Sequence, residues 1–162
     1  MYRILYLTIF TIFYASLPNP ASANELSGAA KAIDGRTIQI AGKTVRLYGI
    51  DSPDLKQTCF TKRKKEFPCG KIAYTALATL VRNVELHCKT TGTGAENAEI
   101  QYVACRAGPM DIATQHVLQG WAFADPKTGD KYRRAERGAR ALNEGLWKGK
   151  FELPWVWREQ HR

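Results

Sequence analysis

Hydrophobic and polar positions alternate in the first part of the chain that follows a long apolar run. Between residues 28 and 50, three short alternating runs are separated by turn signals at Asp34-Gly35 and Ala41-Gly42. A period of two is typical of half-buried strands, because successive side chains of a strand point to opposite faces. The pattern therefore predicts a curled three-stranded meander, with its apolar faces directed into one core.

The period changes to that of a helix over Gly70–Arg82, where apolar residues fall at i, i+4, i+7 and i+8. Two β-like runs follow, Val84–Lys89 and Ile100–Arg106, joined by the polar loop Thr90–Glu99. Two more helices are predicted, and the chain closes in a short aromatic tail. These last segments are Met110–Gln119, Lys131–Asn143, and the tail with Trp147, Phe151, Trp155 and Trp157.

Five strands, with one helix inserted after the third strand and two helices near the end, predict a β-barrel plus helices of the α+β class. We expect a five-stranded OB-fold barrel with three helices rather than a sandwich. The part of the chain from residue 24 to residue 162 is long enough for one hydrophobic core and too short for two ordinary domains.

The first 23 residues have the profile of a signal peptide. One basic residue, Arg3, precedes an uncharged run from Ile4 to Leu17, and Ala21-Ser22-Ala23 offers a small-residue cleavage site. The run is shorter than the ~20 residues that a membrane-spanning helix needs. We expect an exported protein, periplasmic or secreted, whose mature chain begins at Asn24. The alternative is an uncleaved anchor, which the prolines at 18 and 20 disfavour.

Charge narrows the class of partner. Loss of Arg3 leaves 23 basic against 15 acidic residues, a net charge of +8 for the mature chain. Such a surface favours nucleic acid, an anionic polysaccharide or a membrane face, although many soluble proteins are basic without binding any of them. The run Lys62-Arg63-Lys64-Lys65 is the candidate nucleic-acid-binding segment, with an ordinary solvated face as the alternative. We expect a monomer without a transmembrane segment after signal cleavage.

Four cysteines remain in the mature chain, and an even number in an exported protein favours two disulfide bonds. Cys59 and Cys69 flank a polar loop, whereas Cys88 and Cys105 end the two neighbouring β-like runs. We therefore expect the pairs 59–69 and 88–105. A zinc site is disfavoured because no pair has C-x-x-C spacing.

Several short motifs together resemble the thermonuclease, or staphylococcal-nuclease-like, family over roughly residues 28–158. One motif alone would carry little weight, but their order along nearly the whole mature chain makes the resemblance strong. The motifs are Asp34-Gly35-x-Thr37, the run from Val45 to Asp54, Cys69-Gly70-x-x-Ala73, Asp111-Ile112, Gly120-Trp121-Ala122, Tyr132 with Glu136, Ala139-Arg140, Gly145-Leu146-Trp147, and Pro154 with Trp157-Arg158.

The resemblance implies an enzyme that cleaves phosphodiester bonds of DNA and RNA with Ca²⁺. Its two metal-binding carboxylates fall here on Arg36 and Asp51, and its first phosphate-binding arginine falls on Arg46. Its glutamate, which activates or positions water, falls on Asp54, and its second arginine falls on Ile100. Three of these five positions depart from the family pattern, so the nuclease site is expected to be degenerate.

The three departures differ in severity. Asp54 keeps a carboxylate on a shorter side chain, whereas Arg36 removes a metal ligand and adds a cation. The missing arginine at Ile100 would cost about 10²–10³ in rate, with Arg82 or Arg106 as conceivable replacements. Arg36 either enters the metal pocket and pairs with Asp51 or points to solvent. We expect no bound cofactor, and Ca²⁺ only if the nuclease site is functional.

Three functions follow from these expectations. The first is an exported thermonuclease-like protein that is catalytically impaired and binds nucleic acid or another polyanion, or has a structural role in the cell envelope. The alternative is an active Ca²⁺-dependent secreted nuclease, in which Arg46 and Asp54 would be catalytic and Asp51 would bind metal. The further alternative is an accessory role in exopolysaccharide or envelope biogenesis.

Overall fold

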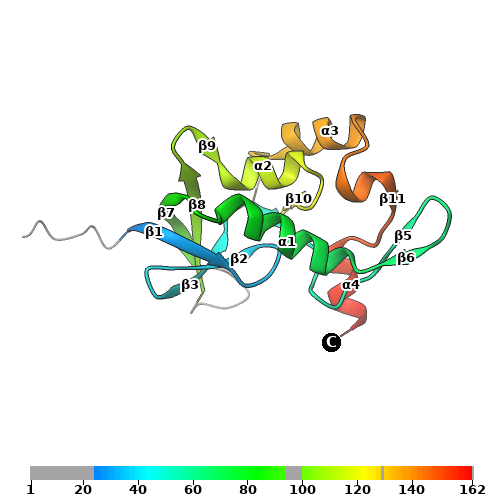
Figure 1. The fold of residues 1–162 in the computed structure, drawn as a ribbon, viewed down its shortest axis with the longest axis horizontal. Helices are drawn as coiled ribbons and strands as arrows, with labels where there is room; N and C mark the ends of the chain where they lie inside the picture. Colours follow the sequence, from blue (N-terminus) through cyan, green and yellow to red (C-terminus); the bar gives the residue numbers. More distant parts are fainter. Residues whose placement is uncertain (1–23, 94–99, 129, 162) are drawn as a thin grey trace, which may run out of the picture.

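The computed structural model describes residues 24–93, 100–128 and 130–161. The predicted signal peptide therefore lies outside the described residues. Five strands form a closed barrel, in which antiparallel neighbours follow the order β3-β2-β1-β7-β8 and a parallel β3–β8 pairing completes the ring (Figure 1). These strands are β1 (Glu25–Ala32), β2 (Thr37–Ile40), β3 (Lys43–Leu47), β7 (Glu85–Thr93) and β8 (Gln101–Ala107). The five-stranded OB-like barrel is confirmed.

The barrel core has the alternation that the sequence predicts. Ile38 of β2 lies opposite Val45 of β3, and both are buried with Ile40 and Leu47. The polar loop predicted from Thr90 begins later than expected, because β7 continues to Thr93 and pairs with the start of β8 across a register shift. The remainder of that loop, residues 94–99, lies outside the described residues.

The helices that cover the barrel follow the predicted pattern with shifted ends. Helix α1 (Cys69–Val81) buries Ala73, Leu77 and Val81. Helix α2 (Ile112–Leu118) starts two residues after the predicted start, because β9 (Met110–Asp111) pairs with β8. The Asp111 carboxylate accepts a hydrogen bond from the Thr114 N–H at 2.8 Å and so caps α2. Helix α3 (Arg133–Ala141) is likewise shorter than expected at both ends.

A second, smaller part of the fold lies beside the barrel. Here β5 (Cys59–Thr61) pairs with both β6 (Glu66–Phe67) and β11 (Gly149–Lys150), and β4 (Ile50–Asp51) pairs with β10 (Phe123–Ala124). A 3-10 helix, η1 (Gly145–Lys148), precedes β11. The last part of the predicted aromatic tail, with Trp155 and Trp157, is in fact a fourth helix, α4 (Pro154–Gln160). The expectation of three helices is therefore wrong for the described residues.

Helix α4 begins with proline at its first turn, where the missing N–H costs nothing. Its Trp155 joins an aromatic cluster that is separate from the barrel core. We use the term aromatic cluster for Phe123, Trp147, Phe151 and Trp155, which pack beside Leu146 and the Cys59–Cys69 bond.

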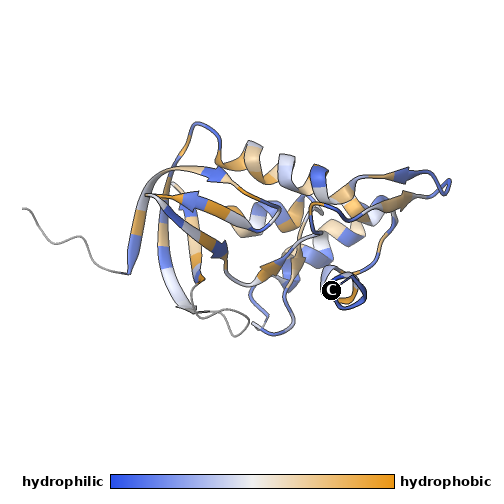
Figure 2. Cartoon of the chain, turned by 90° about the horizontal axis from the view of Figure 1, so that it is seen from below, coloured by the Kyte–Doolittle hydropathy of each residue, from blue (hydrophilic) through white to orange (hydrophobic). Residues whose placement is uncertain are grey.

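Both predicted disulfide bonds are present, Cys59–Cys69 and Cys88–Cys105, so all four cysteines are paired. The second bond joins directly opposed residues of β7 and β8. The first ties the β5–β6 hairpin to the start of α1, and the far end of this hairpin is hydrophilic (Figure 2). In the part of the chain that the structure describes, no helix is long and apolar enough to cross a membrane.

Candidate functional site

The turn between β1 and β2 directs Arg36 toward the interior. The Asp34 carboxylate accepts hydrogen bonds from the backbone N–H groups of Arg36 at 2.8 Å and Thr37 at 2.7 Å, which fixes the turn. Gly35 lies so close to Ser52, the residue after β4, that an added Cβ would stand 2.1 Å from the serine Oγ. Glycine is therefore required at the tightest point of this turn.

Arg36 forms an ion pair with Asp51. The guanidinium Nη1 lies 2.8 Å from Asp51 Oδ1, and the two side chains are 13% and 6% exposed. The same carboxylate oxygen accepts the backbone N–H of Ser52 at 2.8 Å. Of the two orientations considered for Arg36, the structure has the one in which it pairs with Asp51.

A second guanidinium reaches the same carboxylate from α4. Arg158 Nη1 lies 2.8 Å from Asp54 Oδ2 and 3.3 Å from Asp51 Oδ1, and its Nη2 donates to Asp51 Oδ2. Burial by itself would lower the pKa of Arg158, but the hydrogen bonds and negative charges of Asp51 and Asp54 outweigh it and hold the pKa above its ordinary value. Arg158 is therefore charged at every physiological pH.

Arg46 completes what we call the arginine cluster, which consists of Arg36, Arg46 and Arg158 around Asp51. Arg46 lies on β3, opposite Thr37 on one side and Tyr102 of β8 on the other. All three arginines line a cavity of about 60 Å³, together with Asp51, Tyr102, Lys127 and Trp155 among others. The cavity walls carry more cationic than anionic side chains.

The surroundings of Asp51 do not suit Ca²⁺, the metal that the family resemblance implies. Ca²⁺ takes six to eight oxygen ligands, several of them carboxylates. Both oxygens of Asp51 already accept N–H groups, and two of the donors, Arg36 and Arg158, are cations. Within the described ranges, no group of three or more His, Cys, Asp or Glu side chains could hold a metal ion.

The structure brings four of the predicted site residues together and leaves others apart. Asp54 meets Arg158 at the edge of the cluster and is 34% exposed, while Arg36, Arg46 and Asp51 line the cavity. Ile100 lies just before β8 and does not line that cavity. Arg106, a conceivable replacement for the missing arginine, donates to the Pro109 carbonyl instead.

The predicted basic run Lys62, Arg63, Lys64 and Lys65 occupies the turn between β5 and β6, and these residues are exposed. None of them lines the cavity of the arginine cluster. The cluster and the lysine-rich turn are thus two separate basic features of this protein.

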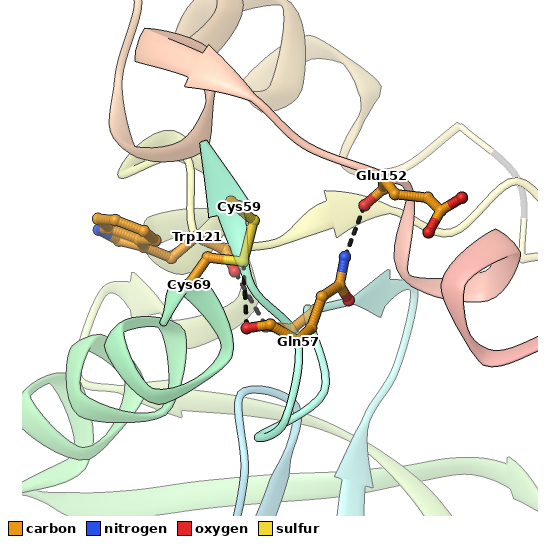
Figure 3. Close-up of a disulfide and its surroundings, with 6 residues drawn as sticks. Gln57, Cys59, Cys69, Trp121 and Glu152 are labelled. Carbon is orange, nitrogen blue, oxygen red and sulfur yellow. Dashed lines mark hydrogen bonds between the residues drawn. A yellow bond between two sulfur atoms is a disulfide. The ribbon is translucent and has the colours of Figure 1, made fainter. Parts of the chain in front are cut away.

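Sequence reasoning missed Arg158 as a site residue, although the Trp157-Arg158 pair was among the motifs of the resemblance. Its position depends on how the chain before α4 is anchored. The buried Gln57 side chain donates from Nε2 to the Glu152 carbonyl at 2.8 Å, beside the Cys59–Cys69 bond (Figure 3). A glutamine between two polar residues gives no sign of this contact, which spans 95 positions.

Comparison with known proteins identifies the family. Residues 44–149 match the family described as staphylococcal nuclease homologue. The chain is 31% identical over 134 residues to "Succinoglycan biosynthesis protein ExoI" of Rhizobium meliloti (strain 1021), a match that covers 81% of this chain and 69% of that protein.

A second relative is "Probable staphylococcal-like nuclease CAN2" of Oryza sativa subsp. japonica, which is 31% identical over 121 residues. That match covers 73% of this chain and 30% of the rice protein, so this chain spans less than a third of that relative's length. The residues that match the family include Arg46, Asp51 and Asp54 and stop before α4. The chain belongs to the staphylococcal nuclease homologue family.

Proposed function

We propose that this protein is an exported member of the nuclease family that lacks Ca²⁺-dependent hydrolysis and binds a polyanion, with nucleic acid as the first candidate. The observation that carries the proposal is the double occupation of Asp51, whose carboxylate receives Arg36 on one oxygen and Arg158 on the other.

The chemistry supports loss of catalysis. A metal in such a site would polarise the phosphate and supply a nucleophile near neutral pH. Arg36 and Arg158 hold the carboxylate that would anchor it, and one carboxylate oxygen of Asp54 accepts a hydrogen bond from Arg158. These side chains are therefore suited to binding and neutralising negative charge rather than to hydrolysis.

The charge distribution supports binding of a polyanion. The mature chain has a net charge of +8 with the expected cleavage, and four of its basic residues form the exposed lysine-rich turn 62–65. Lys/Arg contacts with phosphates release counterions, so affinity for single-stranded DNA should fall steeply with salt and show little sequence preference.

Two measurements on the purified mature chain test the proposal. Denatured DNA should remain uncut with Ca²⁺, and fluorescence anisotropy of a labelled oligonucleotide should show binding that needs no Ca²⁺ and weakens with salt. Cleavage that depends on Ca²⁺ and disappears in Asp51→Asn would show that the site is active. Absence of binding at low salt would reject the polyanion role.

Export has its own support and its own test. Two disulfide bonds that include every cysteine are typical of oxidising compartments. We expect the mature protein to begin at or near Asn24 and to contain no free thiol. Intact-mass measurement with and without reduction checks both points, and two alkylatable cysteines in the unreduced protein would contradict them.

A second candidate function is a role in exopolysaccharide production. It is favoured by the similarity to the succinoglycan biosynthesis protein ExoI, which covers 81% of this chain. Deletion of the gene in its own organism should then lower the amount of exopolysaccharide, and the wild-type gene should restore it. If the Arg36→Ala gene restores production equally well, the arginine cluster has no part in that role.

A further inference from the structure

Helix α4 closes the cavity of the arginine cluster. It starts at Pro154, beyond the end of the family match at residue 149, and two of its side chains, Trp155 and Arg158, form part of the cavity wall. The cavity measures about 60 Å³, whereas pockets for small molecules typically measure about 300–1,000 Å³. With α4 in this position, a nucleotide or a sugar acid cannot enter among Arg36, Arg46 and Asp51.

The two ends of α4 are held differently. At its start, Trp155 packs against Phe123 with 6.3 Å between ring centroids, and the Glu152 carbonyl before it is held by Gln57. Near its end, Trp157 stacks on His161 of the same helix end, with 4.2 Å between ring centroids and 12° between planes. The outer aromatic side chains therefore pack on each other.

Hollows on both flanks indicate that the outer turn of α4 is loosely packed. One hollow of about 640 Å³ separates it from Asp34 and Lys56, and another of about 400 Å³ separates it from Phe60 and Lys150. Trp157 lines both hollows. Arg158, which lines the first hollow, is 21% exposed and connects this turn to Asp51 and Asp54.

We propose that α4 is a lid over the arginine cluster, anchored at Glu152 and held shut by the packing of Trp155 on Phe123 and by the contacts of Arg158 with Asp51 and Asp54. Opening exchanges these contacts for water and uncovers Arg36 and Arg46. A hydrogen bond between charged groups contributes enough free energy that removing one raises the population of the open form roughly tenfold to a hundredfold. Such a lid controls access to the cluster whatever the ligand, and so goes beyond polyanion binding.

Limited proteolysis of the full mature chain tests, without any ligand, whether the contacts of Arg158 hold the lid shut. Chymotrypsin cleaves after Trp155 and Trp157, and its rate follows the population of the open form when opening and closing are fast. Arg158→Ala should raise cleavage at these two sites by about tenfold or more, and Arg158→Lys should lie between Arg158→Ala and wild type. Glu159→Ala is the matched control on the same helix, where an exposed side chain is removed and cleavage should not change.

Two further results distinguish local opening of α4 from global unfolding. Cleavage in Arg158→Ala must stay confined to 155–157, since cuts in the barrel would indicate global unfolding. Asp54→Asn weakens a single interaction of 2.8 Å and should raise cleavage at the same sites by a smaller factor. Equal cleavage of α4 in wild type, Arg158→Ala and Asp54→Asn would show that the contacts of Arg158 do not hold the lid shut.

Oligonucleotide binding gives a second test, because opening the lid and losing a positive charge change the affinity in opposite directions. Arg158→Ala removes a positive charge but opens the lid, so affinity for single-stranded DNA should rise. Arg133→Ala removes the same charge from the exposed face of α3 and should weaken binding slightly. Weaker binding in both variants would overturn the lid as a barrier. Failure of every variant to bind would reject the polyanion role alone, and proteolysis would still decide the lid.

Discussion

The barrel core and the aromatic cluster are two hydrophobic regions with different origins. The barrel core is mainly aliphatic and buries residues that alternate along neighbouring strands, such as Ile38, Val45 and Leu47. In the aromatic cluster, rings from residues 123 to 155 meet at 5.1 to 6.3 Å between centroids, beside a disulfide bond. The first region is encoded by local alternation, whereas the second exists only when distant segments have come together.

The candidate site lies where these two regions meet. Asp51 of β4 pairs in register with Phe123 of β10, so one short pairing joins the carboxylate to the aromatic cluster. The barrel side supplies Arg36 and Arg46, and the aromatic side supplies Arg158 through α4. The family match over residues 44–149 includes Asp51 and parts of both regions, whereas Arg36 and α4 lie outside it. Both guanidinium groups that contact Asp51 therefore come from outside the family match.

The largest expected effect comes from repairing the site on one side or on both. Arg36→Asp, Asp54→Glu and Ile100→Arg restore the family residues on the barrel side but leave Arg158 on Asp51. We expect this triple variant to hydrolyse little DNA, and further Arg158→Ala to raise Ca²⁺-dependent hydrolysis by about 10²-fold or more, because residues that act on one transition state are strongly non-additive.

Initial rates on denatured DNA with and without Ca²⁺ measure this effect. A triple variant as fast as the quadruple variant would show that Arg158 does not block the site. Wild type as fast as the quadruple variant would refute the degenerate site altogether.

Removal of each disulfide bond should show whether the barrel core and the aromatic cluster unfold independently. The sequence separations of 10 and 17 residues predict similar losses of about 3 kcal/mol from chain entropy. Double serine variants at Cys59/Cys69 and Cys88/Cys105 should therefore lower the free energy of unfolding to a similar extent. Only the first pair should also speed chymotryptic cleavage at Trp155, because that bond packs in the aromatic cluster. Equal cleavage in both variants would mean that the regions unfold as one unit.

Acid should weaken the barrel side through His116, which is fully buried. Its Nε2–H donates to the Gly35 carbonyl at 2.9 Å, and burial lowers its pKa from 6.5 to about 4 against the effect of this hydrogen bond. The unfolded chain then binds more protons between these values, so stability is present above pH 6.5 and falls as the pH falls toward 4. The loss between pH 6.5 and 5 should be about 2 kcal/mol.

Urea denaturation at both pH values measures the loss, with His116→Gln as the control, since an amide keeps a donor for Gly35 and does not titrate. The same pH dependence in the variant would assign the loss to other groups.

The smallest effect concerns the lysine-rich turn. Replacing Lys62, Arg63, Lys64 and Lys65 by glutamate should flatten the salt dependence of oligonucleotide binding, with a change of about 0.7 in the logarithmic slope for each phosphate of a single strand that the turn no longer neutralises. Anisotropy titrations over a range of salt concentrations measure the slope. An unchanged slope would show that the oligonucleotide binds to another basic region. The arginines of α3 would be the next residues to test.

The sequence by itself determined the barrel, the course of α1 and both disulfide bonds. Each of these rests on local patterns, such as the alternation around Ile38 and the helical spacing of Ala73 and Leu77, or on the small number of ways to pair four cysteines. It also limited Arg36 to two orientations, because a cation beside a carboxylate either pairs with it or remains solvated.

Only the tertiary structure decided the identity of α4 and the position of Arg158. A seven-residue segment rich in tryptophan has no stable helix of its own, since helix nucleation is costly and short helices depend on packing. Arg158 and Asp51 are 107 residues apart, and their contact requires that Trp155 pack on Phe123 and that Gln57 hold Glu152. Local periodicity carries no information about contacts at that separation, because they are selected by the packing of the complete fold.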